Sequence, residues 1–417
     1  MDKVTRRKFL IASGVVSGGA LAAGATRLAL PQLFASAGAG GVPADTKTLV
    51  VLTLYGGNDG LNTVVPYADA AYHSARPDLA YAADKVLHLN DQLGLNPSLK
   101  GLKKLWDEKR LGIVLGVGYP KPDHSHFRSM DIWQTGSPAK PVRTGWLGRW
   151  LDGTKGTPET AVSFEPVLPP LLAGETVAGA SVPVNGLKLP PSVKSDAVAA
   201  LGRPSPGEPA LQARAAAAMT DLLKVDRLVQ EAKDVAPPPP DPGGEEDKTQ
   251  GATTGGQDAL GTQLDLVARC VEAGVPTRVY SVSLGGFDTH ANERATQERL
   301  LGELDTAVSR FLERMAKTVA GRRVVLVAYS EFGRRVRANA SDGTDHGTAG
   351  PVFVAGAHVQ GGLHGHQPSL TDLDAGDLKM GIDFRDVYGT LLESVLQADA
   401  ARYLDGHGGR LPGLFST

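Results

Sequence analysis

Short runs of β-branched and aliphatic residues alternate with amphipathic stretches along most of this chain. Five runs have the length and composition of buried strands, at 48–55, 111–117, 277–284, 322–329 and 351–355. Between the third and fourth runs, large apolar residues recur at helical spacing from Leu300 to Met315. The pattern predicts an α/β fold in which a mostly parallel central sheet is sandwiched between helices.

This core has to form by packing alone. The chain has 417 residues, 41% of them hydrophobic, and Cys270 is its only cysteine, so no intramolecular disulfide can form. Residues 235–258 contain four consecutive prolines followed by Gly, Glu, Thr and Gln, a composition that cannot bury enough surface to become ordered. We therefore predict a single α/β domain over residues 38–417 with a disordered loop at about 235–258.

Residues 1–37 have the pattern of a twin-arginine signal peptide. Arg6 and Arg7 precede an uncharged run from Ile11 to Ala25, and small residues at 35–37 form a cleavage site. At about fifteen residues, the run is shorter than the ~20 that a membrane-spanning helix needs. We expect export by the twin-arginine translocase to the periplasm or the extracellular space, without a permanent membrane anchor. The alternative is a basic anchor helix that is never cleaved.

Cleavage would also change the charge of the protein. Removal of residues 1–37 moves the formal net charge from -2 to -6, because five basic groups and one acidic group are lost. A mildly acidic surface does not suit a polyanion, so we expect no nucleic acid partner.

Polar clusters follow four of the predicted strands. They are Gly-Gly-Asn-Asp-Gly at 56–60, Asp-His-Ser-His-Phe at 123–127, Gly-Gly-Phe-Asp-Thr-His at 285–290, and Ser-Glu-Phe-Gly-Arg at 330–334, which leads to Thr-Asp-His-Gly at 344–347. The loops that leave the carboxyl ends of parallel strands converge, so these clusters should meet. Six of the ten histidines lie in or beside them or in the loop at 361–366. Imidazole with carboxylate is a donor set for zinc or manganese, which predicts a metal site at this edge.

Two of the clusters also fit a structural role. The segment at 56–60 could be a tight turn, because Asn, Asp and Gly tolerate left-handed backbone conformations. Asp288 or Thr289 could cap the helix predicted over 292–318. Asp345 and His346 favour a functional role, because an ionisable pair ringed by glycines indicates a close backbone approach.

The four clusters, together with Asp-Phe-Arg-Asp-Val-Tyr at 383–388, resemble in sequence order an exported bacterial family, domain-of-unknown-function family 1501. The resemblance covers nearly all of the chain from Thr48 onward. The family in turn resembles a distant branch of the alkaline phosphatase and sulfatase superfamily, whose members have a mixed sheet between helices and typically two metal ions at the strand ends. The resemblance implies one or two divalent ions, zinc or manganese. Asp59, Asp345 and His346 would hold one ion, and Asp288 and His290 a second.

The resemblance also implies a reaction, the hydrolysis of a small-molecule phosphate or sulfate ester. Ser125 would be the nucleophile, and His126 or His124 would protonate the leaving group. Arg334 and Arg335 are candidates for holding the oxygens of the anion.

The chain departs from the superfamily pattern in two places. Asp288 and His290 are two residues apart instead of one helical turn, and the final histidine ligand lies in no secure motif, although His364 and His366 are at about the right distance. These departures favour an alternative function, a non-catalytic exported binding or assembly protein on a degenerate phosphatase-like fold with an unknown exported partner.

Overall fold

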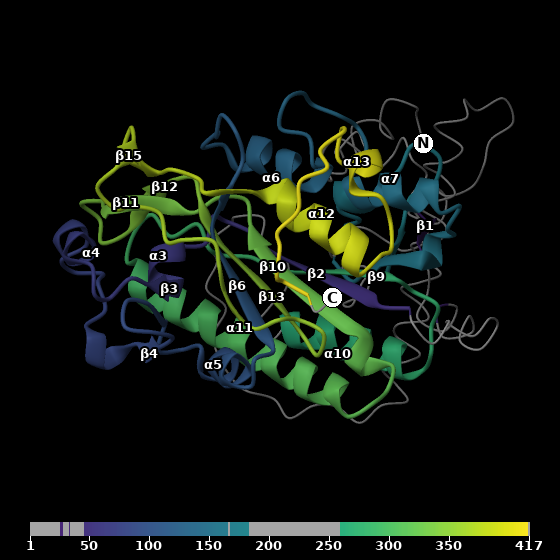
Figure 1. The fold of residues 1–417 in the computed structure, drawn as a ribbon, viewed down its shortest axis with the longest axis horizontal. Helices are drawn as coiled ribbons and strands as arrows, with labels where there is room; N and C mark the ends of the chain where they lie inside the picture. The colour runs from purple at the N-terminus through teal and green to yellow at the C-terminus, as the bar shows by residue number, and fades with distance from the viewer. Residues whose placement is uncertain (1–25, 28–32, 34–45, 166, 183–258, 416–417) are drawn as a thin grey trace, which may run out of the picture.

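The computed structural model describes residues 26–27, 33, 46–165, 167–182 and 259–415. Their centre is a ten-stranded sheet in the order β1-β8-β7-β9-β2-β10-β13-β6-β14, with β17 beside β6 (Figure 1). Most of the predicted signal peptide and the loop predicted at 235–258 lie outside these residues. Thr26 and Arg27 form β1 and pair with β8, although they precede the predicted cleavage site.

All five predicted strands are confirmed. They are β2 (Thr48–Leu54), β6 (Leu111–Gly118), β9 (Val279–Leu284), β10 (Val324–Ser330) and β13 (Gly350–Gly356). β2 pairs in parallel with β9 and β10, whereas β13 runs antiparallel to both β10 and β6. Two antiparallel steps restore the direction, so β6 runs the same way as β10. The four strands followed by polar clusters therefore all end at the same edge.

Short strands complete the sheet at its two sides. They are β1 (Thr26–Arg27), β7 (Ala161–Ser163), β8 (Ala180–Ser181), β14 (Gly362–His364) and β17 (Ile382–Asp383). All the described pairings in this sheet other than those of β13 are parallel, which confirms the mostly parallel architecture.

Helices cover both faces of the sheet (Figure 1). α5 (Lys100–Asp107), α10 (Ala259–Glu272) and α11 (Glu293–Ala316) share a hydrophobic core with one face. α6 (His126–Thr135), α7 (Trp146–Gly153), α12 (Phe384–Ser394) and α13 (Ala400–Tyr403) share a core with the other. In β2, Val50 and Leu52 belong to the first core and Leu49 and Val51 to the second. Burial on both faces explains why the sequence of this strand is a continuous apolar run.

Smaller elements gather at the left of Figure 1. Two hairpins are formed by β11 (Arg334–Ala338) with β12 (Thr344–His346) and by β15 (Leu373–Asp374) with β16 (Asp377–Leu378). Beside them are α3 (Gly60–Thr63), α4 (Ala70–Ala75) and a small sheet of β3 (Val64–Val65), β4 (Leu87–His88) and β5 (Gly94–Leu95). In addition, the described parts of the chain contain short 3-10 helices at different places in the fold, η1 (Ala83–Lys85), η2 (Pro158–Thr160), η3 (Pro170–Leu172) and η4 (Gly321–Arg323).

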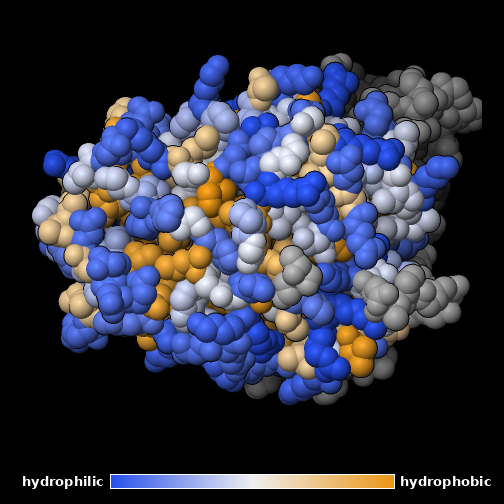
Figure 2. Space-filling view, in the orientation of Figure 1, coloured by the Kyte–Doolittle hydropathy of each residue, from blue (hydrophilic) through white to orange (hydrophobic). Residues whose placement is uncertain are grey.

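The large apolar side chains lie mainly inside these layers. The face drawn in Figure 2 is mostly hydrophilic, with hydrophobic residues in separate small groups. Phe127 is an exception, since it is 91% exposed at the start of α6. Among the helices in the described ranges, none has the length and apolar character needed to cross a membrane.

Candidate metal centre

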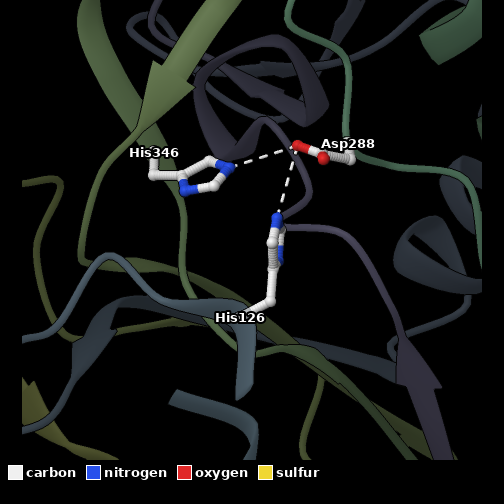
Figure 3. A group of neighbouring side chains, drawn as sticks. All are labelled: His126, Asp288 and His346. Carbon is white, nitrogen blue, oxygen red and sulfur yellow. Dashed lines mark hydrogen bonds and ion pairs between the residues drawn. The ribbon is translucent and has the colours of Figure 1, made fainter. Parts of the chain in front are cut away.

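Side chains from three separate loops meet beyond the strand ends, as the sequence predicts. His126 begins α6 after β6, Asp288 follows β9, and His346 ends β12 beyond β10. One ligand-type atom from each of these residues lies within 4.8 Å of the other two. In Figure 3 both imidazole rings point toward the carboxylate of Asp288.

The Oδ1 atom of Asp288 lies among three imidazole nitrogens. It is 3.4 Å from Nε2 of His126, 3.1 Å from Nε2 of His290 and 3.2 Å from Nε2 of His346. In a tetrahedral zinc site with bonds of about 2.0–2.1 Å, ligand atoms are about 3.3 Å apart. The spacing around Asp288 is therefore close to that of ligands that share one ion.

The outer nitrogen of each imidazole faces an acceptor. The acceptors are Glu331 Oε1 for His126 Nδ1 (2.8 Å), the carbonyl oxygen of His124 for His346 Nδ1 (2.7 Å) and Asp345 Oδ1 for His290 Nδ1 (3.5 Å). For His126 and His346, the acceptor at hydrogen-bond distance assigns the proton to Nδ1 and leaves a lone pair on Nε2, the arrangement typical of metal-binding histidines. Nε2 of His126 is buried and has no hydrogen-bond partner within the described residues. These rings are oriented to bind a cation.

Two glycines allow the loops to come this close. Gly56 has φ +115°, and a Cβ there would lie 2.5 Å from the backbone nitrogen of Asp288. Gly57 has φ +71°, and a Cβ there would lie 2.3 Å from the ring of Phe332, which packs against the imidazoles of His126 and His346 with centroid distances of 4.9 and 4.8 Å. Both conformations and both contacts exclude larger residues, which explains the Gly-Gly pair of the first cluster.

Arg334 connects the same loops. Its side chain donates hydrogen bonds to the carbonyl oxygens of Gly56, Gly57, Phe287 and Thr344, and to Asp288 Oδ1 at 2.9 Å. It is 1% exposed. The prediction that Arg334 holds the oxygens of a substrate is therefore wrong, because its guanidinium is buried and engaged by the backbone. Arg335 is partly exposed and lies 3.4 Å from a carboxylate oxygen of Asp377.

The charge states of the site suit a cation at neutral pH. Burial opposes ionisation of Asp288, but the hydrogen bond from Arg334 and the nearby positive charge lower its pKa to about 2. Burial lowers the pKa of His346, which favours the neutral imidazole that a metal requires. The hydrogen bond to Glu331 raises the pKa of His126, so a metal would have to compete with a proton at this residue in acid.

The family model for "Protein of unknown function (DUF1501)" matches residues 46–416. The chain belongs to this family. The motif resemblance is thereby confirmed at the level of the family. No curated protein matches the sequence.

Solved structures similar to this DUF1501 chain include a protein in the alkaline phosphatase superfamily from Vibrio parahaemolyticus, with 10% identity, a TM-score of 0.40, and coverage of 90% of this chain and 73% of that one. A putative sulfatase from Bacteroides thetaiotaomicron VPI-5482 has 11% identity, a TM-score of 0.33, and coverage of 88% and 76%. The phosphonate monoester hydrolase of Silicibacter pomeroyi has 14% identity, a TM-score of 0.34, and coverage of 88% and 76%.

The other predicted site residues of the DUF1501 chain lie around this group. Asp345 is exposed and lies behind His290, on the side away from Asp288 Oδ1. Ser125 is exposed directly before α6, and its hydroxyl makes no capping bond to the helix. Asp59 is fully buried, accepts a hydrogen bond from the backbone nitrogen of Leu61 and pairs with Arg76 at 2.5 Å. The predicted role of Asp59 as a ligand stays a prediction.

The structure also decides between the alternatives for two clusters. Asp59 caps α3, so the segment at 56–60 does have the structural role of a turn. The helix after β9 begins at Glu293 with Asn292 at its N-cap position, so the prediction that Asp288 or Thr289 caps it is wrong. Asp288 is instead held by Arg334.

Two features of the DUF1501 site escaped the sequence reasoning. His364 lies beside Gly112 near the start of β6, whereas the candidate site lies beyond the end of that strand. His364 is therefore too far along the strand to be the final histidine ligand. The histidine that the sequence reasoning did not assign to the metal is His126. Glu331 contacts His126, but a glutamate after a buried strand carries no signal of that contact. Only its place in the fourth cluster could have drawn attention to it.

Proposed function

We propose that this protein is an exported metal-dependent hydrolase that acts on a phosphate or sulfate ester. The observation that carries the proposal is the arrangement of three imidazole Nε2 atoms within 3.4 Å of Asp288 Oδ1, with each ring facing an acceptor through Nδ1. The four side chains are between 21% and 49% exposed, so a bound ion would be within reach of a small anion. Structural zinc sites are closed, whereas catalytic ones keep an open position.

The residues fit a single zinc or manganese ion. His126, Asp288 and His346 would hold it and leave a fourth position open, and the ion would supply Lewis acid activation of the ester. We therefore assign His126 to the ion instead of to proton transfer. One group of this kind occurs in the described part of the chain, which favours one ion over two.

Ser125 is the proposed nucleophile. It stands exposed next to His126, where the backbone N–H groups at the start of α6 favour an approaching anion. Its hydroxyl makes no capping bond to α6 and can therefore turn toward a substrate bound at the ion. An open position on the ion and an accessible hydroxyl beside it together support hydrolysis more than a purely structural metal site.

Removal of the metal is expected to abolish hydrolysis, and addition of zinc or manganese to restore it, because the ion would activate the ester. Elemental analysis of the purified protein should give about one ion per chain. The substrate panel should pair phosphate and sulfate esters of the same alcohol, such as 4-nitrophenol, so that the leaving group is constant. Tight binding of one ion without turnover of any ester would support the exported binding or assembly protein instead. A protein that binds no ion would contradict the metal centre.

Export is part of the proposal and has its own test. Replacement of both Arg6 and Arg7 by lysine is expected to leave the protein in the cytoplasm, because the twin-arginine receptor distinguishes guanidinium from ammonium. Cell fractionation followed by immunoblotting measures the result. A Lys3→Arg, Lys8→Arg variant is the matched control and should be exported normally. Normal export of the Arg6, Arg7 variant would rule out this route.

A further inference from the structure

We infer that Glu331 is a positioning residue of the metal centre, which orients His126 and raises the affinity of the site for its ion. The inference rests on the proposed metal centre. Glu331 follows β10 directly and is 2% exposed. It touches neither Asp288 nor the proposed ion position, so any effect on the ion has to pass through the imidazole of His126.

The carboxylate of Glu331 is fixed by its neighbours. Its Oε1 accepts hydrogen bonds from the backbone nitrogen of Gly56 at 2.9 Å and from His126 Nδ1 at 2.8 Å. Its Oε2 accepts one from the hydroxyl of Ser330 at 2.9 Å. The Gly56 contact joins Glu331 to the loop after β2, so the residue that orients His126 is itself held by a second loop of the site.

The charge of Glu331 has one ionic partner in the described structure, His126. An ionised carboxylate is costly to bury unless a cation or hydrogen bonds compensate it. A cation on Nε2 withdraws electron density from the imidazole and makes Nδ1–H a stronger donor. The ion and Glu331 would therefore stabilise each other across the ring of His126.

The ring of His126 has little freedom to compensate for the loss of this anchor. It packs between Phe332 and His346, with centroid distances of 4.9 and 4.3 Å. With Nδ1 held by Glu331, Nε2 is left buried and unpaired, 3.4 Å from Asp288 Oδ1. Without the carboxylate, the proton could move to Nε2 and remove the lone pair that faces the site.

Replacement of Glu331 by glutamine is expected to weaken metal binding by about 10–100-fold, the usual effect of losing an outer-shell partner. Glutamine keeps the size of the side chain and an oxygen for the Gly56 N–H, but removes the charge. The dissociation constant for zinc is measured on the purified protein by competition with a chromophoric chelator. Circular dichroism checks that the variant is folded, and Glu331→Asp, which keeps the charge but shortens the reach to Nδ1, provides a second test.

Glu165→Gln is the matched control. Glu165 is also a buried carboxylate that follows a strand of the same sheet, β7, but it accepts hydrogen bonds from Ser281 at 2.6 Å and Tyr55 at 3.2 Å and contacts no imidazole of the described site. Its removal should leave the zinc dissociation constant unchanged. An equal loss of affinity in both variants would show a general effect of a buried charge and overturn the inference.

A double-mutant cycle with His126→Ala separates positioning from a structural role. If Glu331 acts through His126, Glu331→Gln should cause no further loss of zinc affinity in the His126→Ala background. Additive losses would overturn the inference. Wild-type affinity in both Glu331 variants would also overturn it while leaving the proposed function intact. Absence of metal binding by the wild-type protein would instead refute the proposed function.

Discussion

The Asp288→Asn variant is expected to lose more than about 100-fold in metal affinity, beyond the usual effect of an outer-shell change, and to lose hydrolysis with it. Asp288 Oδ1 is the atom that all three imidazole nitrogens approach within 3.4 Å. Its charge is maintained at neutral pH by its low pKa, about 2, because the hydrogen bond and charge of Arg334 outweigh the effect of burial. Asparagine keeps the shape of the side chain but supplies no charge.

Asp345→Asn is the matched control for this variant. Both aspartates were predicted as ligands, but Asp345 is more than half exposed and contacts the outer nitrogen of His290 at 3.5 Å. The control should lose no more than an outer-shell residue does, about 10–100-fold. Elemental analysis and zinc titration of the two variants compare them directly. If Asp345→Asn is the more severe change, the ion lies on the other side of His290 and the site has to be redrawn.

The Arg76→Met variant is expected to lower the free energy of unfolding by about 3–5 kcal/mol, the usual cost of removing one partner of a buried ion pair. Arg76 and Asp59 are both fully buried and lie 2.5 Å apart. Burial and the nearby Asp59 raise the pKa of Glu293 to about 9, so Glu293 is neutral at pH 7. Burial opposes ionisation of Asp59 and the charge of Arg76 lowers its pKa, so the variant loses the interaction that stabilises this buried carboxylate.

Denaturant unfolding of the purified variant measures this effect. Lys103→Met is the control, because Lys103 forms an i,i+4 pair with a 59% exposed Asp107, which should be worth about 0.5 kcal/mol. Asp59→Asn should also destabilise the protein but keep one ion per chain. Loss of the ion in Asp59→Asn, or a mild effect of Arg76→Met, would indicate that Asp59 binds the metal as the sequence predicted.

The sheet and the place of the site could be predicted because each rests on a local pattern. Strands buried on both faces read as continuous apolar runs, and β2, β6, β9 and β10 share one direction, so the clusters that follow them converge. The clusters that contain Asp288, His290 and His346 were located from this pattern, and the family resemblance suggested these residues as ligands. β13 is antiparallel to both β10 and β6, so β6 runs in the same direction as β10 and the cluster after it lies at the same edge.

The roles within the site could not be predicted, because they depend on partners that are distant in sequence. From the sequence, His126 was interpreted as a proton donor. The structure shows that its Nδ1 is hydrogen-bonded to Glu331, which is 205 positions away. From the sequence, Asp59 was interpreted as a metal ligand. The structure shows that it pairs with Arg76, which is 17 positions away. Arg334 reads as an anion-binding arginine, and only the carbonyl groups around it show otherwise. Spacing along the chain contains no information on such pairings.

The contacts of Arg334 affect how this edge of the protein could be redesigned. Its guanidinium binds carbonyl oxygens from the loop after β2, the loop after β9 and the first residue of β12. A carbonyl is present whatever the side chain, so these contacts tolerate substitutions in the loops. The same contacts do not tolerate insertions or deletions in the loops, because these would shift the carbonyl oxygens away from the buried guanidinium of Arg334. Loop grafting at this edge would therefore succeed only if the three segments were exchanged together at constant length, and new specificity would have to come from side chains on the unaltered backbone.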